Sequence, residues 1–190
     1  MKRIAVKIGS AVLSGTDGYI RHKVIVNLID DVAGLMKLGY QVIIISSGAV
    51  IIGKSVSQLS VPDFAVSPPS KYDAKLLREQ ILASVGQPKL MGLYNEGFEK
   101  HNLSCAQILT TRSDFADRKF YLSLRIVTEE LLRHGIIPIF NENDVLSPEE
   151  LDFSDNDQLA LMTAAMVLAD RLVILTDVAG VYDRPPHELG

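Results

Sequence analysis

The sequence has few of the residues that define several classes of protein. Among its 190 residues there is one cysteine, Cys105, and there is no tryptophan. A single cysteine excludes an intramolecular disulfide framework and any metal site built from several cysteines, and it is compatible with a reducing compartment. No apolar run reaches the roughly 20 residues of a membrane-spanning helix, and the first residues lack the apolar core of a signal peptide. These absences predict a cytoplasmic protein that does not bind a membrane.

The charge balance also excludes a class of partner. The chain has 19 Lys and Arg residues against 23 Asp and Glu, which gives a net charge of -4. A protein with no basic excess has no electrostatic footprint for nucleic acid, so we expect small molecules and other subunits as partners. Hydrophobic residues make up 47% of the chain, enough to bury the core of one globular domain.

Short apolar runs alternate with longer segments of helical periodicity. The runs predict strands at residues 4–8, 41–45, 106–109, 136–140 and 172–175. The periodic segments predict a helix over 24–36 that Gly39 ends, one that Asp73 caps, one that Pro88 opens, one over 118–135 and one over 156–169. This alternation predicts an α/β fold, a three-layer α/β/α sandwich around a mainly parallel sheet. Residues 61–70 predict a surface loop, a candidate lid or hairpin.

Polar residues follow every predicted strand. Each cluster alone is typical of turns and helix caps. Five of them share the carboxyl-terminal edge of a parallel sheet, where open α/β sheets bind ligands. The clusters are Lys7 with Gly9 and Ser10, Ser46 to Ala49, Thr110 to Arg112, Asn141 to Asp144, and Thr176 with Asp177.

Three of these residues favour an anionic ligand. Lys7 lies in an apolar strand, so its ammonium either reaches solvent at the strand's open end or pairs with an anion. Gly9 and Gly48 lack a Cβ, so backbone N–H groups beside them can approach a phosphate or a carboxylate. The chain has neither a GxGxxG nor a GxxxxGK[ST] motif, so neither a Rossmann dinucleotide site nor a P-loop is supported.

A second polar cluster, Asp155-Asn156-Asp157, leads into an apolar helix. One of its residues is explained as a helix N-cap, and the others favour the helix dipole. A protein-built Mg²⁺ or Ca²⁺ site is the alternative, although the spacing of an EF-hand is missing. The four histidines have neither metal-binding nor triad spacing, and Cys105 fits a small buried side chain better than a nucleophile.

Six motifs, in order along the chain, resemble motifs of the glutamate 5-kinases within the amino acid kinase family. The lysine-glycine start and the Thr-Asp turn are shared widely among these kinases, whereas the others are typical of glutamate 5-kinases. Ser154 replaces the glycine that is usual before Asp155. The motifs are VKIGS at 6–10, SSGA at 46–49, QILASVGQ at 80–87, NEND at 141–144, FSDND at 153–157 and LTDVAGVY at 175–182.

The resemblance implies a carbamate kinase-like fold and ATP-dependent phosphorylation of the γ-carboxylate of L-glutamate, the first step of proline biosynthesis. It implies ATP and Mg²⁺ as cofactors, proline as a feedback inhibitor, and a homo-oligomer, a dimer or a tetramer. It also assigns roles by position. These are Lys7 and Asp157 as catalytic residues, Ser47, Gly48, Asp144 and Asn156 as substrate-binding residues, and Lys7, Gly9, Ser10, Thr176 and Asp177 as nucleotide-binding residues.

The resemblance also shows what the sequence lacks. Residues 1–190 match an amino acid kinase domain without the GTGGM-x-TK segment that supplies a second phosphate-binding lysine, and without the RNA-modification-type domain that many members carry. We therefore expect a C-terminally truncated kinase domain. Two alternatives stay open, which are a non-catalytic protein that binds glutamate or proline on the same scaffold, and another family member that acts on carbamate or aspartate.

Overall fold

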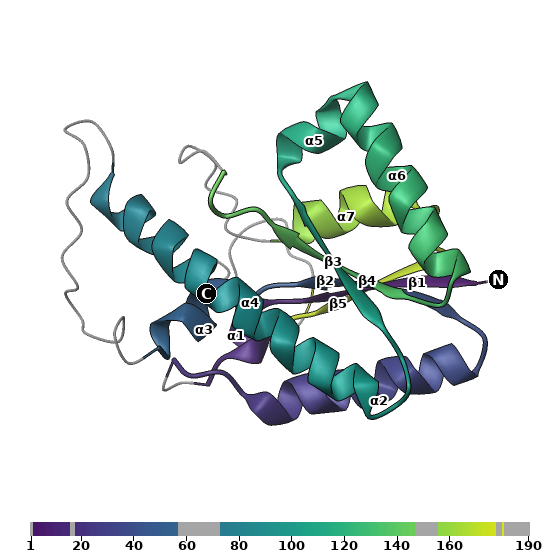
Figure 1. Cartoon of the computed structure of the whole chain (residues 1–190), viewed down its shortest axis with the longest axis horizontal. Helices are drawn as coiled ribbons and strands as arrows, with labels where there is room; N and C mark the ends of the chain where they lie inside the picture. The colour runs from purple at the N-terminus through teal and green to yellow at the C-terminus, as the bar shows by residue number, and fades with distance from the viewer. Residues whose placement is uncertain (1, 16–17, 57–72, 147–155, 178–179, 181–190) are drawn as a thin grey trace.

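A parallel sheet forms the centre of the described structure. The computed structural model of the chain describes residues 2–15, 18–56, 73–146, 156–177 and 180. Within these ranges five strands pair in the order β3-β4-β2-β1-β5, and every pair is parallel (Figure 1). The strands are β1 (Arg3–Ile8), β2 (Gln41–Ser46), β3 (Cys105–Thr110), β4 (Ile137–Glu142) and β5 (Arg171–Leu175).

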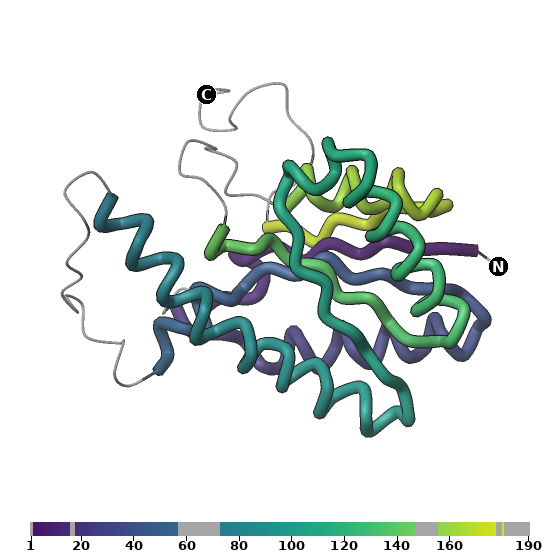
Figure 2. Tube along the Cα trace, turned by 45° about the horizontal axis from the view of Figure 1, so that its top comes forward, coloured from purple at the N-terminus to yellow at the C-terminus, as the bar shows by residue number. Residues whose placement is uncertain are grey.

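Helices cover both faces of the sheet, which confirms the predicted three-layer α/β/α sandwich (Figure 1). Among the described residues no helix combines the length and the apolar character that crossing a membrane requires. One face carries α1 (Ser10–Leu13), α2 (His22–Lys37), α3 (Ala49–Lys54) and α4 (Ala74–Glu99), and the other carries α5 (Arg112–Ala116), α6 (Arg118–Arg133) and α7 (Asp157–Met166) (Figure 1 and Figure 2).

The alternation of side chains along β1 decides which residues face which layer. Ile4, Val6 and Ile8 pack into the core beneath α2 and α4, whereas Ala5 packs into the core beneath α6 and α7. Successive side chains of a strand point to opposite faces, so Lys7 lies on the same face as Ala5, beneath α7. A charged residue near the carboxyl end of a buried strand thus meets the start of a helix.

Several helix ends lie where the sequence predicts them. The Asp73 side chain accepts a hydrogen bond from the Leu76 N–H at 2.8 Å and caps α4. Gly39, with φ at 83°, follows α2 in the left-handed region as expected. Asn156 directly precedes α7, which ends at Met166 rather than at residue 169. The predicted loop over residues 61–70 lies outside the described residues.

One helix prediction is wrong. Pro88 does not open a new helix but lies inside α4, which continues from Ala74 to Glu99. A proline inside a helix removes one backbone hydrogen bond and costs about 3 kcal/mol. The helix stays continuous because side chains on both sides of Pro88 are buried in the protein, including Leu82 before it and Leu90 after it.

The apolar face of α6 also differs from the prediction. The apolar series that predicts this helix runs through Leu122, Ile126, Leu131 and Leu132, but Leu122 and Ile126 are 44% and 63% exposed. Leu132 is buried as expected, and the side that packs against the sheet continues from it through Thr128 and Leu124, which are spaced four residues apart and so share one face with it. The sequence of this helix is compatible with two apolar faces, and packing against the sheet determines which of them is buried.

Candidate functional site

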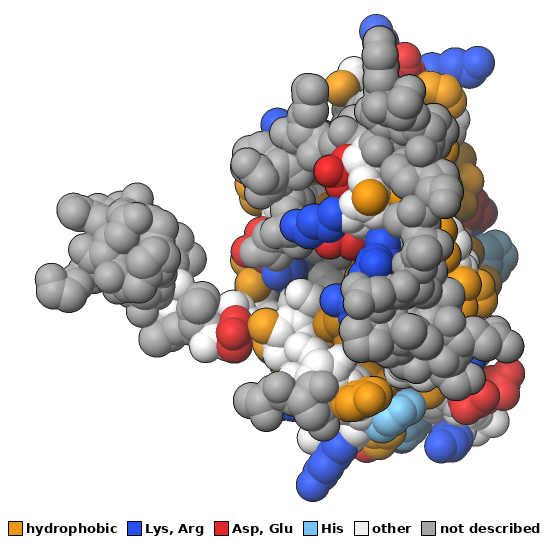
Figure 3. All heavy atoms as spheres, turned by 90° about the vertical axis from the view of Figure 1, so that its left-hand side faces the viewer, with side chains coloured by type: hydrophobic (Ala, Val, Ile, Leu, Met, Phe, Trp, Pro, Cys, Tyr) orange, Lys and Arg blue, Asp and Glu red, His pale blue; other side chains and the backbone are white. Residues whose placement is uncertain are grey.

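The polar clusters that follow the strands gather at one end of the molecule, because parallel strands place all their carboxyl ends at one edge of the sheet. This edge lies to the left in Figure 1, and Figure 3 views it end-on. Basic and acidic side chains lie next to one another in the middle of that surface (Figure 3). A ligand bound there would contact several strands at once.

Lys7 pairs with a carboxylate at this edge. Its Nζ lies 2.6 Å from Oδ1 of Asp157, and its side chain is only 4% exposed. This confirms the anion-paired reading of Lys7 over the solvent-reaching one. A Cβ on Gly9 would lie 3.3 Å from the same Nζ, so the absence of a side chain at residue 9 keeps the space beside the ammonium open.

Asn156 holds the ends of two neighbouring strands together. Its Nδ2 lies 2.9 Å from the Ser46 carbonyl oxygen, 3.0 Å from the Ser47 Oγ and 3.0 Å from the Asn141 Oδ1. Ser46 ends β2, and Asn141 lies near the end of β4. Ser47 and Asn156, two of the predicted substrate-binding residues, are therefore in direct contact.

Two consecutive residues at the start of α7 thus join the two halves of the edge. Asn156 contacts the ends of β2 and β4, while Asp157 contacts Lys7 on β1. The helix begins at Asp157, so the positive end of its dipole faces the junction of the two halves. A ligand held by Ser47 would therefore lie close to the Lys7 ammonium, which Asp157 contacts.

The backbone at residue 48 is in the left-handed conformation, which favours glycine. Its φ is 107°, a value that residues with a side chain rarely adopt, and it directly precedes α3. The turn of Ser47 and Gly48 connects β2 to α3 in this way, with the Ser47 N–H bound to the Ile8 carbonyl at 3.2 Å.

Asp144 lines a separate hollow of about 240 Å³ between α4 and the residues that follow β4. Burial, followed by the neighbouring carboxylates of Glu142 and Glu79, raises the pKa of Asp144 to about 6. Gln87 lines the same hollow. A carboxylate that is buried beside two others gains most from a cationic group, so this hollow favours an ammonium.

The predicted nucleotide-binding turn lines a second hollow. Thr176 and Asp177 lie with Arg21 and Ser14 around a space of about 470 Å³ beside α1. Ser10 is the exposed first residue of α1 and does not line this hollow. The hollow of Asp144 and the hollow of Thr176 share no residue, so Asp144 lies apart from Thr176 and Asp177, and Ser47, Gly48 and Asn156 line neither hollow.

Three residues contribute to these surroundings without having been predicted. Asn141 contacts Asn156, Gln87 contacts Asn141, and Arg21 lines the second hollow. Asn141 belongs to a polar cluster after a strand, which is a signal that could have identified it. Gln87 ends the QILASVGQ motif, which is a second kind of signal, whereas Arg21 carries none, because polar residues beside a helix are usually solvated.

The remaining candidates have ordinary structural environments. The thiol of Cys105 donates to the Asn95 Oδ1 at 2.9 Å. Burial, with the nearby Glu99 carboxylate, raises the pKa of Cys105 to about 11, so it carries no nucleophilic thiolate at neutral pH. Among the residues described, no three of His, Cys, Asp and Glu gather as a metal site. Asp155 lies outside the described residues.

Known proteins resemble this chain over nearly its whole length. The sequence pattern described as the amino acid kinase family matches residues 2–189. Glutamate 5-kinase 1 of Bacillus licheniformis is 43% identical over 187 residues, which cover 98% of this chain and 48% of that protein. Glutamate 5-kinase of Bacteroides thetaiotaomicron is 39% identical over 186 residues, which cover 98% of this chain and 49% of that protein.

A solved structure extends the comparison to the fold. Giardia carbamate kinase superposes with a TM-score of 0.59 at 17% identity, covering 93% of this chain and 73% of that one. This likeness confirms the carbamate kinase-like fold. The chain spans about half the length of the curated relatives that it matches.

Proposed function

Because the chain belongs to the amino acid kinase family, we propose that it forms the amino-acid-binding and phosphoryl-transfer part of a glutamate 5-kinase. The reaction transfers the γ-phosphoryl group of ATP to the γ-carboxylate of L-glutamate and gives γ-glutamyl phosphate and ADP. The observation that carries the proposal is the junction at α7, where Asn156 contacts Ser47 while Asp157 contacts Lys7. Curated glutamate 5-kinases at about 40% identity support the choice of substrate.

The proposed chemistry needs charge neutralisation rather than a base. The γ-carboxylate of glutamate has an ordinary pKa of about 4.3, so it is already ionised at neutral pH. One of its oxygens attacks the γ-phosphorus, the bond from that phosphorus to the β,γ-bridging oxygen breaks, and the oxygen leaves with ADP. Two anions must approach each other, so catalysis depends on positioning and on cations. Lys7 supplies a buried ammonium at the junction where they would meet.

The proposed amino-acid subsite is formed by residues at the carboxyl-terminal ends of β2 and β4, together with Asn156, which contacts both ends. The Ser47 hydroxyl and the Gly48 N–H are suited to a carboxylate. The Asn156 Nδ2 already contacts three acceptors, so the Asn156 Oδ1 and the Asp144 carboxylate are suited to the α-ammonium. Asp144 belongs to the same segment as Asn141, which contacts Asn156 directly. This segment would therefore bring the ammonium-binding group close to the carboxylate-binding ones.

The proposed nucleotide subsite lies beside β1 and β5. The Gly9 N–H is bound to the Leu175 carbonyl at 3.2 Å, which joins the two loops at the ends of these strands. Thr176 and Asp177 line the neighbouring hollow, and Ser10 begins α1 close to Gly9. The described residues form no acidic cage, so they fit a Mg²⁺ ion held chiefly by the nucleotide phosphates, whose charge it would neutralise.

The wider expectations belong to the same proposal. We expect proline to compete with glutamate as a feedback inhibitor, the active protein to be a homo-oligomer, and the compartment to be the cytoplasm. Measuring the affinity for glutamate with and without proline tests the first of these expectations. Sedimentation at several protein concentrations tests the second.

A trapping experiment tests the reaction itself. The chain is incubated with glutamate, ATP, Mg²⁺ and hydroxylamine, which converts γ-glutamyl phosphate into a stable hydroxamate. The proposal expects hydroxamate with glutamate and none with aspartate, and no ATP-dependent turnover of carbamate. Glutamate binding without any turnover would identify a non-catalytic binding protein, and turnover of carbamate or aspartate would identify a different member of the family.

The pKa of Asp144 predicts how glutamate affinity depends on pH. Its pKa of about 6 means that Asp144 loses its charge as the pH falls below 6. Only the carboxylate pairs with the α-ammonium, so we expect the affinity to fall by about tenfold for each pH unit below that value. Calorimetric titration of glutamate between pH 5 and pH 8 measures this.

Asp144→Asn is the matched variant for this prediction. It should bind glutamate weakly at every pH and show no dependence around pH 6. The folded-state pKa lies above the ordinary 3.8, so ionisation of Asp144 destabilises the parent protein as the pH rises from 4 to 6. The variant lacks this cost and should be at least as resistant to denaturant at pH 7.5. An unchanged glutamate affinity in the variant would exclude Asp144 from the subsite.

A further inference from the structure

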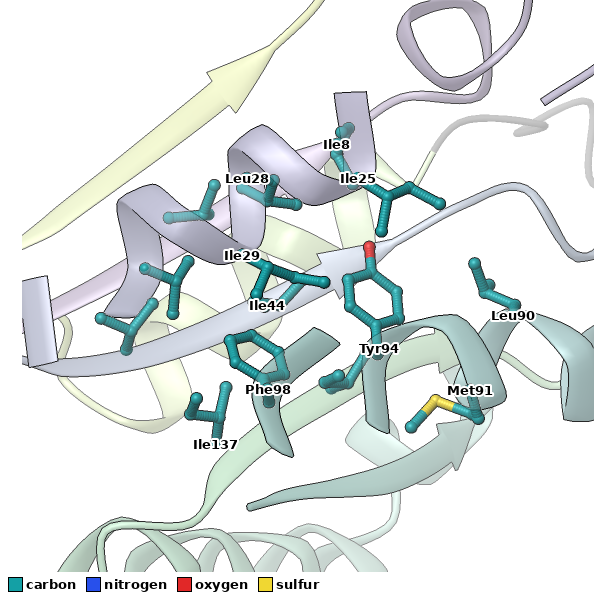
Figure 4. Close-up of a cluster of buried hydrophobic side chains, with 14 of the residues drawn as sticks. Ile8, Ile25, Leu28, Ile29, Ile44, Leu90, Met91, Tyr94, Phe98 and Ile137 are labelled. Carbon is teal, nitrogen blue, oxygen red and sulfur yellow. The ribbon is translucent and has the colours of Figure 1, made fainter. Parts of the chain in front are cut away.

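Two polar side chains on α4 point into the protein beneath the proposed amino-acid subsite. Gln87 and Tyr94 are buried and lie seven positions apart in the sequence, so they are two turns apart on one face of the helix. Figure 4 shows the ring of Tyr94 rising from α4 with its hydroxyl oxygen directed away from the helix. A buried hydroxyl or amide costs stability unless it is hydrogen-bonded, so the partners of these two groups are informative.

The Tyr94 hydroxyl begins a short chain of hydrogen bonds that ends at Ser47. Its oxygen lies 2.9 Å from the Ser46 Oγ, which donates its one proton to the Ser47 carbonyl oxygen, also at 2.9 Å. Since the Ser46 proton is used there, Tyr94 must be the donor to Ser46. Burial raises the pKa of Tyr94 to about 12, so the phenol keeps its proton at neutral pH.

This chain fixes the direction of a backbone N–H in the subsite. The Ser47 carbonyl and the Gly48 N–H belong to one peptide group, and the described residues contain no cis peptide bond. In a trans peptide these two groups point in opposite directions. Holding the carbonyl toward Ser46 therefore holds the Gly48 N–H on the side away from Ser46, as a fixed donor.

Gln87 acts in a similar way on the other half of the subsite. Its Oε1 accepts a hydrogen bond from the Asn141 Nδ2 at 2.8 Å. The other end of the Asn141 amide, its Oδ1, is thereby turned toward the Asn156 Nδ2, 3.0 Å away, and the Glu142 N–H, 2.9 Å away. An Asn141 amide turned the other way would present an NH₂ group to the Asn156 NH₂ group and would lose this contact.

We propose that Gln87 and Tyr94 are positioning residues, through which α4 orients Asn156 and the Ser47–Gly48 peptide for an amino-acid ligand. This inference rests on the proposed glutamate subsite and deepens it. Neither residue needs to touch the ligand, because each acts through a residue that would. The helix holds both halves of the subsite from beneath, so the distance between the halves depends on one rigid element.

Tyr94→Phe and Gln87→Met test this inference, since each removes the hydrogen-bonding atom and keeps most of the side-chain volume. The expected result is a loss of about tenfold in glutamate affinity, the consequence of one misplaced hydrogen-bonding group. ATP affinity, measured with a fluorescent nucleotide analogue, should change by less than about twofold on the same scale. Turnover at saturating glutamate should fall much less than turnover at low glutamate.

Phe98→Leu is the control for stability. Phe98 is buried one turn beyond Tyr94 and stacks on it with the ring centroids 6.3 Å apart, but it has no polar group. This variant should lower the melting temperature as much as Tyr94→Phe or more, and it should leave glutamate affinity unchanged. If Phe98→Leu weakens glutamate binding to the same extent as Tyr94→Phe, the effect is general loosening and the inference is wrong.

A second readout does not depend on glutamate. The amide resonance of Gly48 should shift, and its hydrogen exchange should speed up, in Tyr94→Phe but not in Phe98→Leu. If the parent chain binds no glutamate, the proposed function fails, and the Gly48 amide still decides whether Tyr94 positions that peptide. If the parent chain binds glutamate and neither the affinity nor the Gly48 amide changes in Tyr94→Phe, the inference fails alone.

Discussion

Replacing Lys7 with alanine should remove turnover while leaving glutamate binding nearly intact. The Lys7 ammonium is buried beside Asp157, and the proposed phosphoryl transfer brings two anions together at that point. Removing one preorganised charge that stabilises a transition state costs about 3 to 4 kcal/mol, or roughly a hundredfold to a thousandfold in rate. The amino-acid subsite uses Ser47 and Asn156 instead, so glutamate affinity should change by less than about threefold.

Two comparisons make the Lys7 result interpretable. Lys54→Ala removes an exposed lysine at the end of α3 and should leave both turnover and binding unchanged. Lys7→Ala leaves the buried Oδ1 of Asp157 without its cation, but the Asp157 side chain as a whole is 45% exposed and the deleted ammonium leaves space beside Oδ1, so water can solvate the carboxylate and the variant should stay folded. Hydroxamate formation and glutamate calorimetry on the same preparations give the two quantities. An equal loss of turnover and of binding would contradict the assigned role.

The sheet could be predicted because its strands are apolar and short. Each of the five predicted runs overlaps a strand of the structure, with ends that differ by at most two residues. Lys7 could be singled out for the same reason, since a charge inside such a run is costly without a partner. The residue pattern alone left open which anion that partner is, because Asp157 is 150 positions further along the chain, and the resemblance to the amino acid kinases is what singles out Asp157.

The parts that could not be predicted are those that tertiary packing decides. Local preference favours a helix start at Pro88, yet burial on both sides of that residue keeps α4 continuous. The periodicity of α6 allows two apolar stripes, and only the position of the sheet selects the one through Thr128. From the sequence, Tyr94 is expected to be a core side chain. It does pack in the core, but its hydroxyl also lies 2.9 Å from the Ser46 Oγ. Such a double role depends on a contact between residues that are far apart in the chain.

The α3–α4 contact depends on glycines that allow the two backbones to touch. A Cβ on Gly86 would lie 1.8 Å from the Ala49 carbonyl oxygen and 2.6 Å from the Gly53 nitrogen. A Cβ on Gly53 would lie 2.0 Å from the Leu82 carbonyl oxygen. Backbone atoms of a helix cannot rotate away as a flexible side chain does, so any side chain at these positions must push the helices apart.

We therefore expect Gly86→Ala to destabilise the protein by about 3 kcal/mol or more, although alanine is the better helix former. Gly92→Ala is the matched control on the same helix, because nothing lies within 4 Å of a Cβ at Gly92. There the helix preference acts alone and should stabilise by up to about 1 kcal/mol. Denaturant unfolding of both variants measures the two changes in the free energy of unfolding. Stabilisation in both variants would show that α3 can move away without cost.

The displacement of α3 should also reach the amino-acid subsite, because α3 begins directly after Gly48. Folded Gly86→Ala should therefore bind glutamate more weakly, while Gly92→Ala should bind it as the parent does.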